Sequence, residues 1–487
     1  MAHSKVQSRY NHIVEVYKKG GSDTHQEKIM TKLKILALIT SLAIIIRMVI
    51  PLNDVFNAGF INFLGPDSYY HASVLKGILA NFPTVPSMYI QDWVIVGIAW
   101  LVTFGEPSMR TVELIAIFTP PLMAGAVILL VYFISSRLFG RVPALIAASF
   151  AAFIPGEFLE RTLLGNIDHH AAEVLVTTAI MAIVVYVITS KSKKLMALGI
   201  VCLPVAVLVY YYCWPGLGRL ITSGFFSQSG LTLATTTEAV SITSLSPYQV
   251  ISINSYQILH ILLGITCLAA LVKSGTGWQR FVIAAWLLFA TGVTTYQLRF
   301  DYYLIVPLGI VAGYALHHAV SRFSVFNFIN LFVAGLLLIH SSFIYGAILP
   351  GNHLTPSADW NWAAIWIKGN TSDNTTLLAW WDYGHFLRYR AEREPFVDPG
   401  QCSNKVPIAA RVLLSNSDNI NIPADYIIID SKTAYKYNEA MCQWAGIDHK
   451  SLDSEKTLAR RLYTGQEPKG FELVYDSTVK IWSTGNK

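Results

Sequence analysis

The stretch VELIAIFTPPLMAGAVILLVYFISS, residues 112–136, decides the fold class of this chain. It contains one charged side chain, Glu113, and a helix needs about 20 predominantly apolar residues to cross the hydrocarbon core of a bilayer. Arg137 and Arg141 follow it directly. An apolar run of this length that ends in basic residues is typical of a membrane-spanning helix with a cytoplasmic end.

The composition of the whole chain supports the same interpretation. The 487 residues are 53% hydrophobic and only 14% charged, whereas a soluble domain usually carries about 25% charged residues. A disordered chain has less apolar surface than this, and five cysteines are too few for a disulfide scaffold. We therefore predict a polytopic membrane protein with nine spans, at roughly 35–52, 112–136, 142–158, 171–189, 195–213, 250–272, 279–297, 302–318 and 325–348.

Short basic loops give these spans an orientation. With nine spans, all the basic loops fall on one side, and the positive-inside rule makes that side cytoplasmic. The net charge of +6 is thus a topology signal rather than a nucleic-acid-binding patch. We expect a plasma-membrane protein with a cytoplasmic N-terminus, a transmembrane domain at 1–349 and an extracytoplasmic domain at 350–487. The basic residues are Lys32, Lys34, Arg137, Arg141, Lys191, Lys193, Lys194, Lys273, Arg280 and Arg322.

The segment 350–487 is polar and has mixed periodicity. Its first part has helical spacing, and the runs 376–381, 425–429 and 472–482 have the composition of strands. The sequence therefore predicts a small mixed α/β domain outside the membrane.

Charged and imidazole side chains gather in the predicted outer loops, beside helix ends. Each has an ordinary explanation: an aspartate can cap a helix, a loop glutamate or histidine is usually solvated, and an interface arginine reaches toward water. Together on one face they favour a metal site, because carboxylate and imidazole suit a cation such as Mn²⁺. A metal beside an arginine can receive a pyrophosphate. The residues are Asp67, Asp168-His169-His170, Glu238 and Arg299.

The motif Trp380-Trp381-Asp382-Tyr383-Gly384 follows the first strand-like run. An aromatic cluster with a turn is the simplest explanation, yet two adjacent tryptophans before a carboxylate are rare. With this motif and the outer-face groups in this order, the chain resembles the catalytic subunit of oligosaccharyltransferase, in its archaeal or bacterial single-subunit form. The resemblance implies a polytopic α-helical membrane protein of the GT-C glycosyltransferase type, with a C-terminal extracytoplasmic mixed α/β domain.

The resemblance also implies a reaction. An oligosaccharide would move from a polyprenyl phosphate or pyrophosphate lipid, dolichyl or undecaprenyl, to Asn in Asn-x-Ser/Thr sequons. The donor lipid, the acceptor polypeptide and membrane lipids would be the partners, with no nucleic acid. Mn²⁺ or Mg²⁺ would be the cofactor, held by Asp67, Asp168 and His170, with Glu238 as a candidate further ligand.

The remaining implied roles concern the two substrates. Asp67 and Glu238 would contact the acceptor amide. Arg299, with His169, would bind the lipid phosphate and stabilise its charge as it departs. The Ser/Thr hydroxyl of the acceptor would be read by Trp380, Trp381 and Asp382, since an acceptor without it leaves polar groups unpaired.

The chain departs from the family pattern in several places. The family usually has more spans, and the segment between Asp168 and Glu238 is correspondingly short. Gly65 stands where an earlier acid is usual, and Asp430 lies near the place of a further Ser/Thr-pocket motif, with different spacing. Two alternatives stay open: another polyprenyl-lipid-dependent membrane glycosyltransferase, or an inactive short-form relative that binds glycolipid. A transporter is disfavoured, because it should place ionisable residues at mid-membrane.

Overall fold

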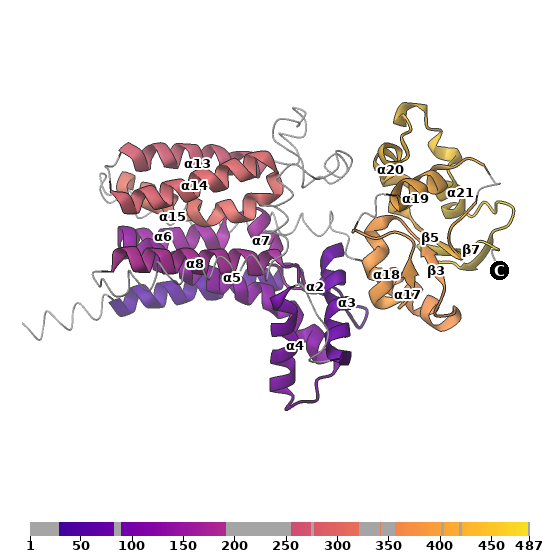
Figure 1. Cartoon of the computed structure of the whole chain (residues 1–487), viewed down its shortest axis with the longest axis horizontal. Helices are drawn as coiled ribbons and strands as arrows, with labels where there is room; N and C mark the ends of the chain where they lie inside the picture. The colour runs from indigo at the N-terminus through magenta and orange to yellow at the C-terminus, as the bar shows by residue number, and fades with distance from the viewer. Residues whose placement is uncertain are drawn as a thin grey trace, which may run out of the picture.

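The computed structural model describes residues 29–81, 89–190, 255–273, 277–320, 341, 356–400, 404–417 and 421–485. The predicted span 195–213, the predicted span 325–348 except residue 341, and the candidate Glu238 lie outside these residues. Figure 1 shows a bundle of long helices, a C-terminal domain, and between them the helices α3 (Pro66–Asn81) and α4 (Ile90–Val102), which run across the end of the bundle.

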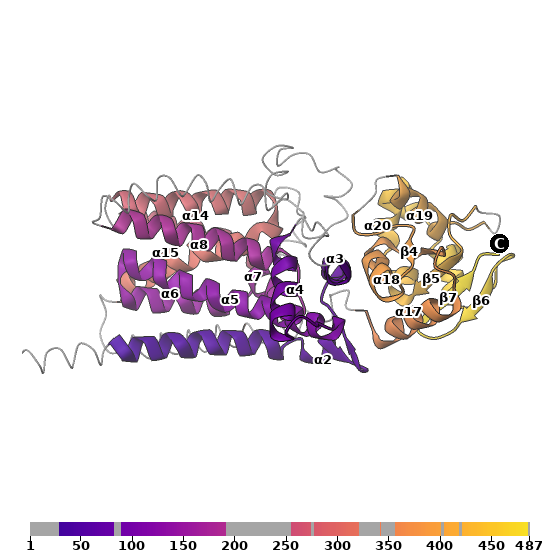
Figure 2. The ribbon, with the colours of Figure 1, turned by 60° about the horizontal axis from the view of Figure 1, so that its bottom comes forward.

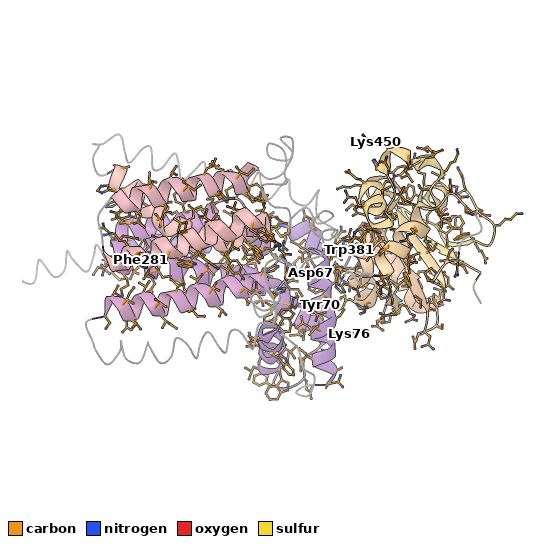
Figure 3. The ribbon with its side chains drawn as sticks, turned by 45° about the horizontal axis from the view of Figure 1, so that its top comes forward. Asp67, Tyr70, Lys76, Phe281, Trp381 and Lys450 are labelled. Carbon is orange, nitrogen blue, oxygen red and sulfur yellow. The ribbon has the colours of Figure 1, made fainter. Side chains whose placement is uncertain are left out.

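The bundle is apolar inside and outside. Several of its helices are long and apolar enough to cross a membrane, and its surface exposes large apolar side chains such as Leu38 (68% exposed) and Phe281 (73% exposed; Figure 3). The chain is therefore a multi-pass membrane protein, as its composition predicts. The long helices are Ile29–Val49, Met109–Phe139, His170–Thr189 and Leu298–Ala319. Among the described residues, the bundle helices that follow Ile29–Val49 are α5 (Met109–Phe139), α6 (Arg141–Phe153), α8 (His170–Thr189), α13 (Ser255–Lys273), α14 (Trp278–Tyr296) and α15 (Asp301–Val320).

The core of the bundle lies where α15 packs against α6. A Cβ atom added to Gly313 would lie 2.6 Å from the carbonyl oxygen of Pro143, closer than any side chain can approach. Small residues at such a contact let two helix backbones touch, which is how helices associate where lipid removes the hydrophobic driving force.

The predicted span 142–158 is shorter in the structure. Helix α6 ends at Phe153, because Pro155 has no N–H to continue the helix and Gly156 has φ of +143°. A short helix, α7 (Glu157–Arg161), follows. The break turns the chain sideways at the end of the bundle and begins the loop that carries Asp168.

The C-terminal domain is a mixed five-stranded sheet with helices on it, as predicted. The sheet order is β4-β3-β5-β7-β6, with β3 parallel to β4 and β5, and β7 antiparallel to β5 and β6. Its strands are β3 (Thr376–Leu378), β4 (Glu394–Pro395), β5 (Tyr426–Asp430), β6 (Glu472–Tyr475) and β7 (Val479–Ser483). Its longer helices are α17 (Ala358–Asn370), α18 (Gly384–Arg390), α19 (Lys405–Leu414), α20 (Asn438–Ala445) and α21 (Leu458–Tyr463).

The prediction of one strand over 472–482 was wrong. The run forms a hairpin of β6 and β7, and the Ser477 hydroxyl sits in the turn between them. That hydroxyl accepts from the Val479 N–H at 3.1 Å and donates to the Val479 carbonyl at 2.9 Å. A serine that satisfies nearby backbone groups in this way favours a turn over a continuous strand.

Helix α18 docks the C-terminal domain against α3. The rings of Tyr69 on α3 and Phe386 on α18 meet edge to face at 5.2 Å, inside a buried cluster that both parts share. Two buried hydrogen bonds add to this contact: the Tyr389 hydroxyl donates to Glu113 at 2.5 Å, and Asn361 donates to Asn62 at 2.9 Å. Figure 2 shows the same order of bundle, α3 and C-terminal domain from a second direction. This junction places the motif 380–384 close to the start of α3.

Candidate functional site

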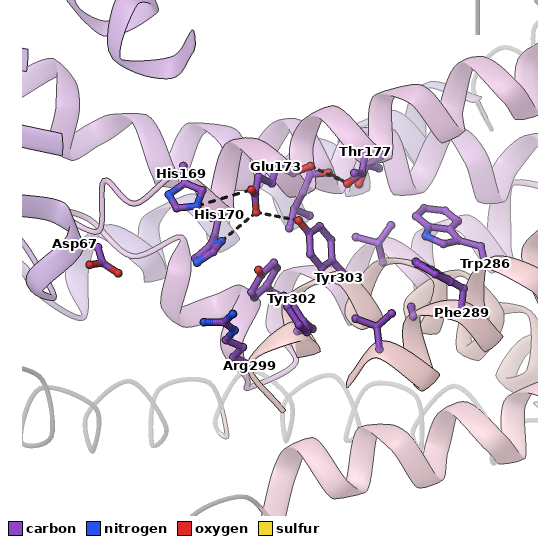
Figure 4. A pocket seen from close by; sticks show the side chains of 16 residues that line it. Asp67, His169, His170, Glu173, Thr177, Trp286, Phe289, Arg299, Tyr302 and Tyr303 are labelled. Carbon is purple, nitrogen blue, oxygen red and sulfur yellow. Dashed lines mark hydrogen bonds and ion pairs between the residues drawn. The ribbon is translucent and has the colours of Figure 1, made fainter. Parts of the chain in front are cut away.

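Asp67 lies within the first turn of α3 rather than before it. Pro66 is the first helical residue, and Gly65, with φ of +76°, turns the chain into the helix. The ordinary role of an N-cap therefore does not account for the Asp67 carboxylate. The side chain is exposed and lines one end of a pocket whose other lining residues belong to the bundle (Figure 4).

The triplet Asp168-His169-His170 joins the loop after α7 to the start of α8. The Asp168 carboxylate is only 2% exposed and directs its two oxygens to different partners. Its Oδ1 lies 2.7 Å from His169 Nδ1, while its Oδ2 lies 3.5 Å from His170 Nε2 and accepts from Arg161 Nη1 at 3.3 Å. The loop thus concentrates one buried carboxylate and three cationic or imidazole groups.

The charges in this cluster shift one another. Burial alone would raise the pKa of Asp168, but His170, His169 and Arg161 together lower it well below its usual range. Burial opposes a charge on His169, yet Asp168 raises its pKa to about 9. Surrounding protein atoms desolvate Asp67 and, with the Asp168 carboxylate, raise its pKa. The cluster therefore stabilises bound positive charge, so protons and a metal cation would compete for the same carboxylate and imidazole atoms.

Sequence reasoning missed several members of the cluster. His71 and Asp92 form a buried pair, and Glu173 lies 3.0 Å from His170 Nδ1 and accepts from the Tyr303 hydroxyl at 2.8 Å. Helical spacing could have found two of them. His71 follows Asp67 by four residues, and Glu173 follows His170 by three, so each pair shares a helix face.

Two groups of these side chains can hold a metal ion. One contains His71, Asp168 and His169, and the other His169, His170 and Glu173; within each group the ligand atoms lie within 4.8 Å of one another. Nitrogen and oxygen donors together suit Mn²⁺, Zn²⁺ or Fe²⁺ better than an all-oxygen site does. The donor set thus fits a metal ion. Asp67, a predicted ligand, is in neither group but borders the same pocket.

The pocket beside this cluster has a polar end and an apolar end. It encloses about 350 Å³ between α8, α14 and α15. Asp67, His169, His170 and Arg299 lie at one end and the rings of Trp286 and Phe289 at the other (Figure 4). A ligand with a charged head and a hydrocarbon body matches this division.

Arg299 supplies positive charge at the polar end. It lies on η3 (Leu298–Phe300), the single 3₁₀ turn before α15, and its guanidinium stacks on the Phe300 ring at 5.1 Å. Arg299 forms no ion pair with the nearby Asp301, whose carboxylate lies 2.9 Å from His260 Nδ1 instead. The Arg299 Nε is buried with no hydrogen-bond partner among the described residues. Such a donor suits an anion.

The motif Trp380–Gly384 contains buried residues and two half-buried residues. Trp380 is 1% exposed and packs in the domain core. Trp381 and Asp382, on η5 (Trp381–Tyr383), are half-buried, and Trp381 lies on the side of the domain that faces Asp67 (Figure 3). The Trp381 indole N–H has no partner among the described residues. Desolvation raises the pKa of Asp382 to about 7.

Both carboxylate oxygens of Asp430 accept hydrogen bonds inside the C-terminal domain. Its Oδ1 accepts from the backbone N–H and the hydroxyl of Thr433, at 2.8 and 2.7 Å. Its Oδ2 accepts from Tyr383 at 2.5 Å and from Trp360 at 3.2 Å. The carboxylate therefore holds Tyr383 and the start of the next helix in place. These contacts explain the position of Asp430 without a role in acceptor binding.

Bundle, junction and site together define a multi-pass membrane protein in which carboxylate, imidazole and guanidinium side chains gather at one end of the bundle, next to a separate α/β domain. Comparison with known families names this combination. The family model described as "Oligosaccharyl transferase STT3, N-terminal" matches residues 77–274, and "STT3/PglB/AglB core domain" matches residues 373–462. The two matches cover more than half of the chain, which belongs to the STT3/PglB/AglB family of oligosaccharyltransferases.

The curated relatives are archaeal. Dolichyl-phosphooligosaccharide-protein glycotransferase 2 of Pyrococcus horikoshii is 39% identical over 72 residues, which are 14% of this chain and 9% of the relative. Dolichyl-phosphooligosaccharide-protein glycotransferase 3 of Archaeoglobus fulgidus is 30% identical over 158 residues, 29% of this chain and 18% of the relative. The matched segments span less than a quarter of these relatives' length.

Solved structures share the fold over nearly the whole chain. The oligosaccharyltransferase AglB from Archaeoglobus fulgidus, in complex with an inhibitory peptide and a dolichol-phosphate, matches with a TM-score of 0.75 and 15% identity, over 92% of this chain and 80% of that one. An Archaeoglobus fulgidus oligosaccharyltransferase in complex with Zn and sulfate matches with a TM-score of 0.69 and 16% identity, over 91% and 79%. The predicted family and fold class are thus confirmed.

Proposed function

We propose that this protein transfers an oligosaccharide from a dolichyl or other polyprenyl (pyro)phosphate lipid to the side-chain amide of Asn in Asn-x-Ser/Thr sequons. The observation that carries the proposal is that three features gather where the bundle meets the C-terminal domain. A carboxylate–imidazole cluster adjoins the polar end of an apolar pocket, where the Arg299 Nε has no hydrogen-bond partner among the described residues. The half-buried Trp381 lies on the side of the C-terminal domain that faces Asp67, and the next residue, Asp382, is close enough to Asp67 for their charges to interact.

At the donor side, Arg299 and His169 bind the phosphate of the lipid, and the apolar end of the pocket receives the start of the polyprenyl chain. Asp67, Asp168 and His170 would hold Mn²⁺ or Mg²⁺. A bound divalent cation would supply Lewis-acid stabilisation of the negative charge on the phosphate. Arg299 stabilises the same charge as the bond between the sugar C1 and the phosphate oxygen breaks.

At the acceptor side, the amide nitrogen forms the new bond to C1 and passes one proton to the Asp67 carboxylate that it contacts. Its lone pair is delocalised into the amide carbonyl, so it is a weak nucleophile. Asp67, with Glu238, accepts hydrogen bonds from the amide N–H groups and frees electron density for attack. Trp381 donates to the Ser/Thr hydroxyl and Asp382 accepts from it, with Trp380 as the packed support behind them.

The proposal also covers the assembly and its orientation. The basic loops favour a cytoplasmic N-terminus and an extracytoplasmic C-terminal domain in the plasma membrane. A boundary near residue 349 between transmembrane and extracytoplasmic domains fits the composition shift, and the enzyme acts as a single subunit.

Transfer to a peptide tests the proposed function directly. Purified protein, Mn²⁺ and lipid-linked oligosaccharide from the source organism are mixed with a fluorescent Asn-x-Thr peptide, and glycosylation is read as a gel shift. We expect a shift with this peptide, none with a Gln-x-Thr peptide, and at least a 100-fold loss of rate after chelation with EDTA, restored by Mn²⁺. A folded protein that binds the lipid but modifies only a non-peptide acceptor would instead identify another polyprenyl-lipid glycosyltransferase.

The pKa of Asp382 predicts a pH dependence of acceptor binding. Because that pKa is about 7, the carboxyl loses its proton between pH 6 and 8. The ionised form accepts the Ser/Thr hydroxyl more strongly, so affinity for an Asn-x-Thr peptide should rise about fivefold from pH 6 to pH 8. Fluorescence anisotropy without metal or lipid measures this. Asp382→Asn should bind weakly at every pH, and an unchanged slope in that variant would place the titrating group elsewhere.

A further inference from the structure

A buried histidine–carboxylate pair joins α3 to α4 beside the cluster. His71 Nδ1 lies 2.9 and 3.1 Å from the two oxygens of Asp92, and the side chains are 1% and 0% exposed. A carboxylate can only accept here, so Nδ1 carries the proton and Nε2 of the neutral ring carries the lone pair. The next residue, Gln91, donates to the carbonyl of Ile167 at 2.9 Å, which ties α4 to the loop that carries Asp168.

The lone pair of His71 faces the metal-binding cluster. His71 Nε2 lies 3.4 Å from His169 Nδ1 and 3.9 Å from Asp168 Oδ1. Metal–ligand bonds of 2.0–2.2 Å set neighbouring ligand atoms about 3 to 3.6 Å apart, so a shift of a few tenths of an ångström would let His71 Nε2 and Asp168 Oδ1 share one ion. No carboxylate competes for this nitrogen at hydrogen-bonding distance among the described residues.

We propose that His71 is a further metal ligand through Nε2, and that Asp92 is a positioning residue that fixes the tautomer and orientation of its ring. A carboxylate that accepts from the far nitrogen of a metal-bound histidine is a common supporting contact and raises the basicity of the ligand. His71 thereby adds a nitrogen on the Oδ1 side of Asp168, opposite His170. The inference rests on the proposed function for the presence of a divalent cation.

A second buried histidine–aspartate pair has the same geometry but lies away from the metal-binding cluster. His260 Nδ1 lies 2.9 and 3.1 Å from the two oxygens of Asp301, between α13 and α15, with exposures of 2% and 0%. His260 belongs to neither group of metal-binding side chains in the described residues. Breaking this pair therefore costs a buried histidine–carboxylate contact and should leave metal affinity unchanged.

The spacing along α3 explains how His71 reaches the ion. Asp67 and His71 are four residues apart on one helix, so both side chains project from the same face. Helix α3 is also the element against which the C-terminal domain packs. A ligand on α3 would thus couple occupancy of the metal site to the position of the helix that supports the acceptor-binding domain.

Metal binding by full-length protein tests the inference without lipid or peptide. Metal-free wild type, His71→Gln, Asp92→Asn, the double variant and His260→Gln are titrated with Mn²⁺, and free Mn²⁺ is read by EPR. We expect a loss of affinity of about 10- to 100-fold for His71→Gln and about tenfold for Asp92→Asn. The double variant should match His71→Gln, because Asp92 acts through His71. His260→Gln should lower the unfolding temperature and keep wild-type affinity.

A second readout keeps the inference testable if one variant does not fold. Pulsed EPR on Mn²⁺-loaded wild type should show one more histidine nitrogen coupled to the metal than the folded His71 variant, whether Gln or Asn. Wild-type affinity and unchanged nitrogen coupling in that variant would make the pair purely structural. Absence of saturable Mn²⁺ binding to wild type would also overturn the inference. Failure of peptide glycosylation in protein that binds Mn²⁺ as expected would count against the proposed function alone.

Discussion

Replacing Asp67 with Asn should lower the rate of transfer to a peptide by about 100- to 1,000-fold, the loss typical of removing one group that stabilises a transition state. Asn keeps the size of the side chain but removes the charge. Because Asp67 is accessible and its negative charge is close to that of Asp168, the fold loses nothing when the charge is removed. Single-turnover gel-shift assays at saturating Mn²⁺, donor and peptide would measure the rate.

The control for this experiment is Asp373→Asn. Asp373 is 97% exposed, and its carboxylate pairs with Arg393 in the C-terminal domain at 3.1 Å. The exposed Asp373 carboxylate contributes little to stability, and Arg393 keeps its hydrogen bonds to Thr371 and Lys368, so this variant should transfer at the wild-type rate. Near wild-type transfer by Asp67→Asn, with a normal unfolding temperature, would show that Asp67 has no part in catalysis.

Replacing Gly384 with Ala should destabilise the C-terminal domain by about 3 kcal/mol and abolish acceptor binding. A Cβ atom at this position would lie 2.3 Å from the carbonyl oxygen of Val397 and 2.5 Å from the Cα of Asp398. Both are backbone atoms, so the contact cannot be relieved by a side-chain rotation. Gly384 begins α18, and displacing that helix also moves Trp381 and Asp382.

The matched control is Gly369→Ala on α17. A Cβ there meets nothing within 4 Å, and alanine is the better helix former by about 1 kcal/mol. We expect this variant to be as stable as wild type or slightly more stable, with unchanged peptide affinity. Thermal unfolding in detergent and peptide anisotropy separate the two variants. Equal unfolding temperatures would mean that the close approach at Gly384 is relaxed in solution.

The sequence was most informative where a residue type has a local physical meaning. Runs such as 112–136 predict membrane helices because a bilayer accepts only backbones that bond internally. The motif 380–384 identifies the family because its rare residues are consecutive. Sequence patterns were least informative where the end of a helix or strand depends on one residue. Pro155 ends a predicted span early, and Ser477 forms a turn that divides a predicted strand into two.

The roles assigned to the site residues remain predictions, and the structure adds partners that no single stretch reveals. Glu238 lies outside the described residues, and Asp67, Asp168, His170 and Arg299 border one pocket or its adjoining loop. His71 and Asp92 were missed because they are 21 residues apart and meet only when α3 packs on α4. Asp92 is the single acidic residue of α4, an apolar helix too short to span a membrane, and nothing in that segment connects it with a metal site.

By itself, the sequence determined that this chain is a multi-pass membrane protein of the oligosaccharyltransferase family, because hydrocarbon thickness and a contiguous motif are both local constraints. Only the tertiary structure decided which side chains line the pocket, and that Trp380 and Asp430 are buried in their domain. Burial, hydrogen-bond partners and distances between charges arise when segments far apart in the chain pack together. Residue spacing within one segment cannot encode them.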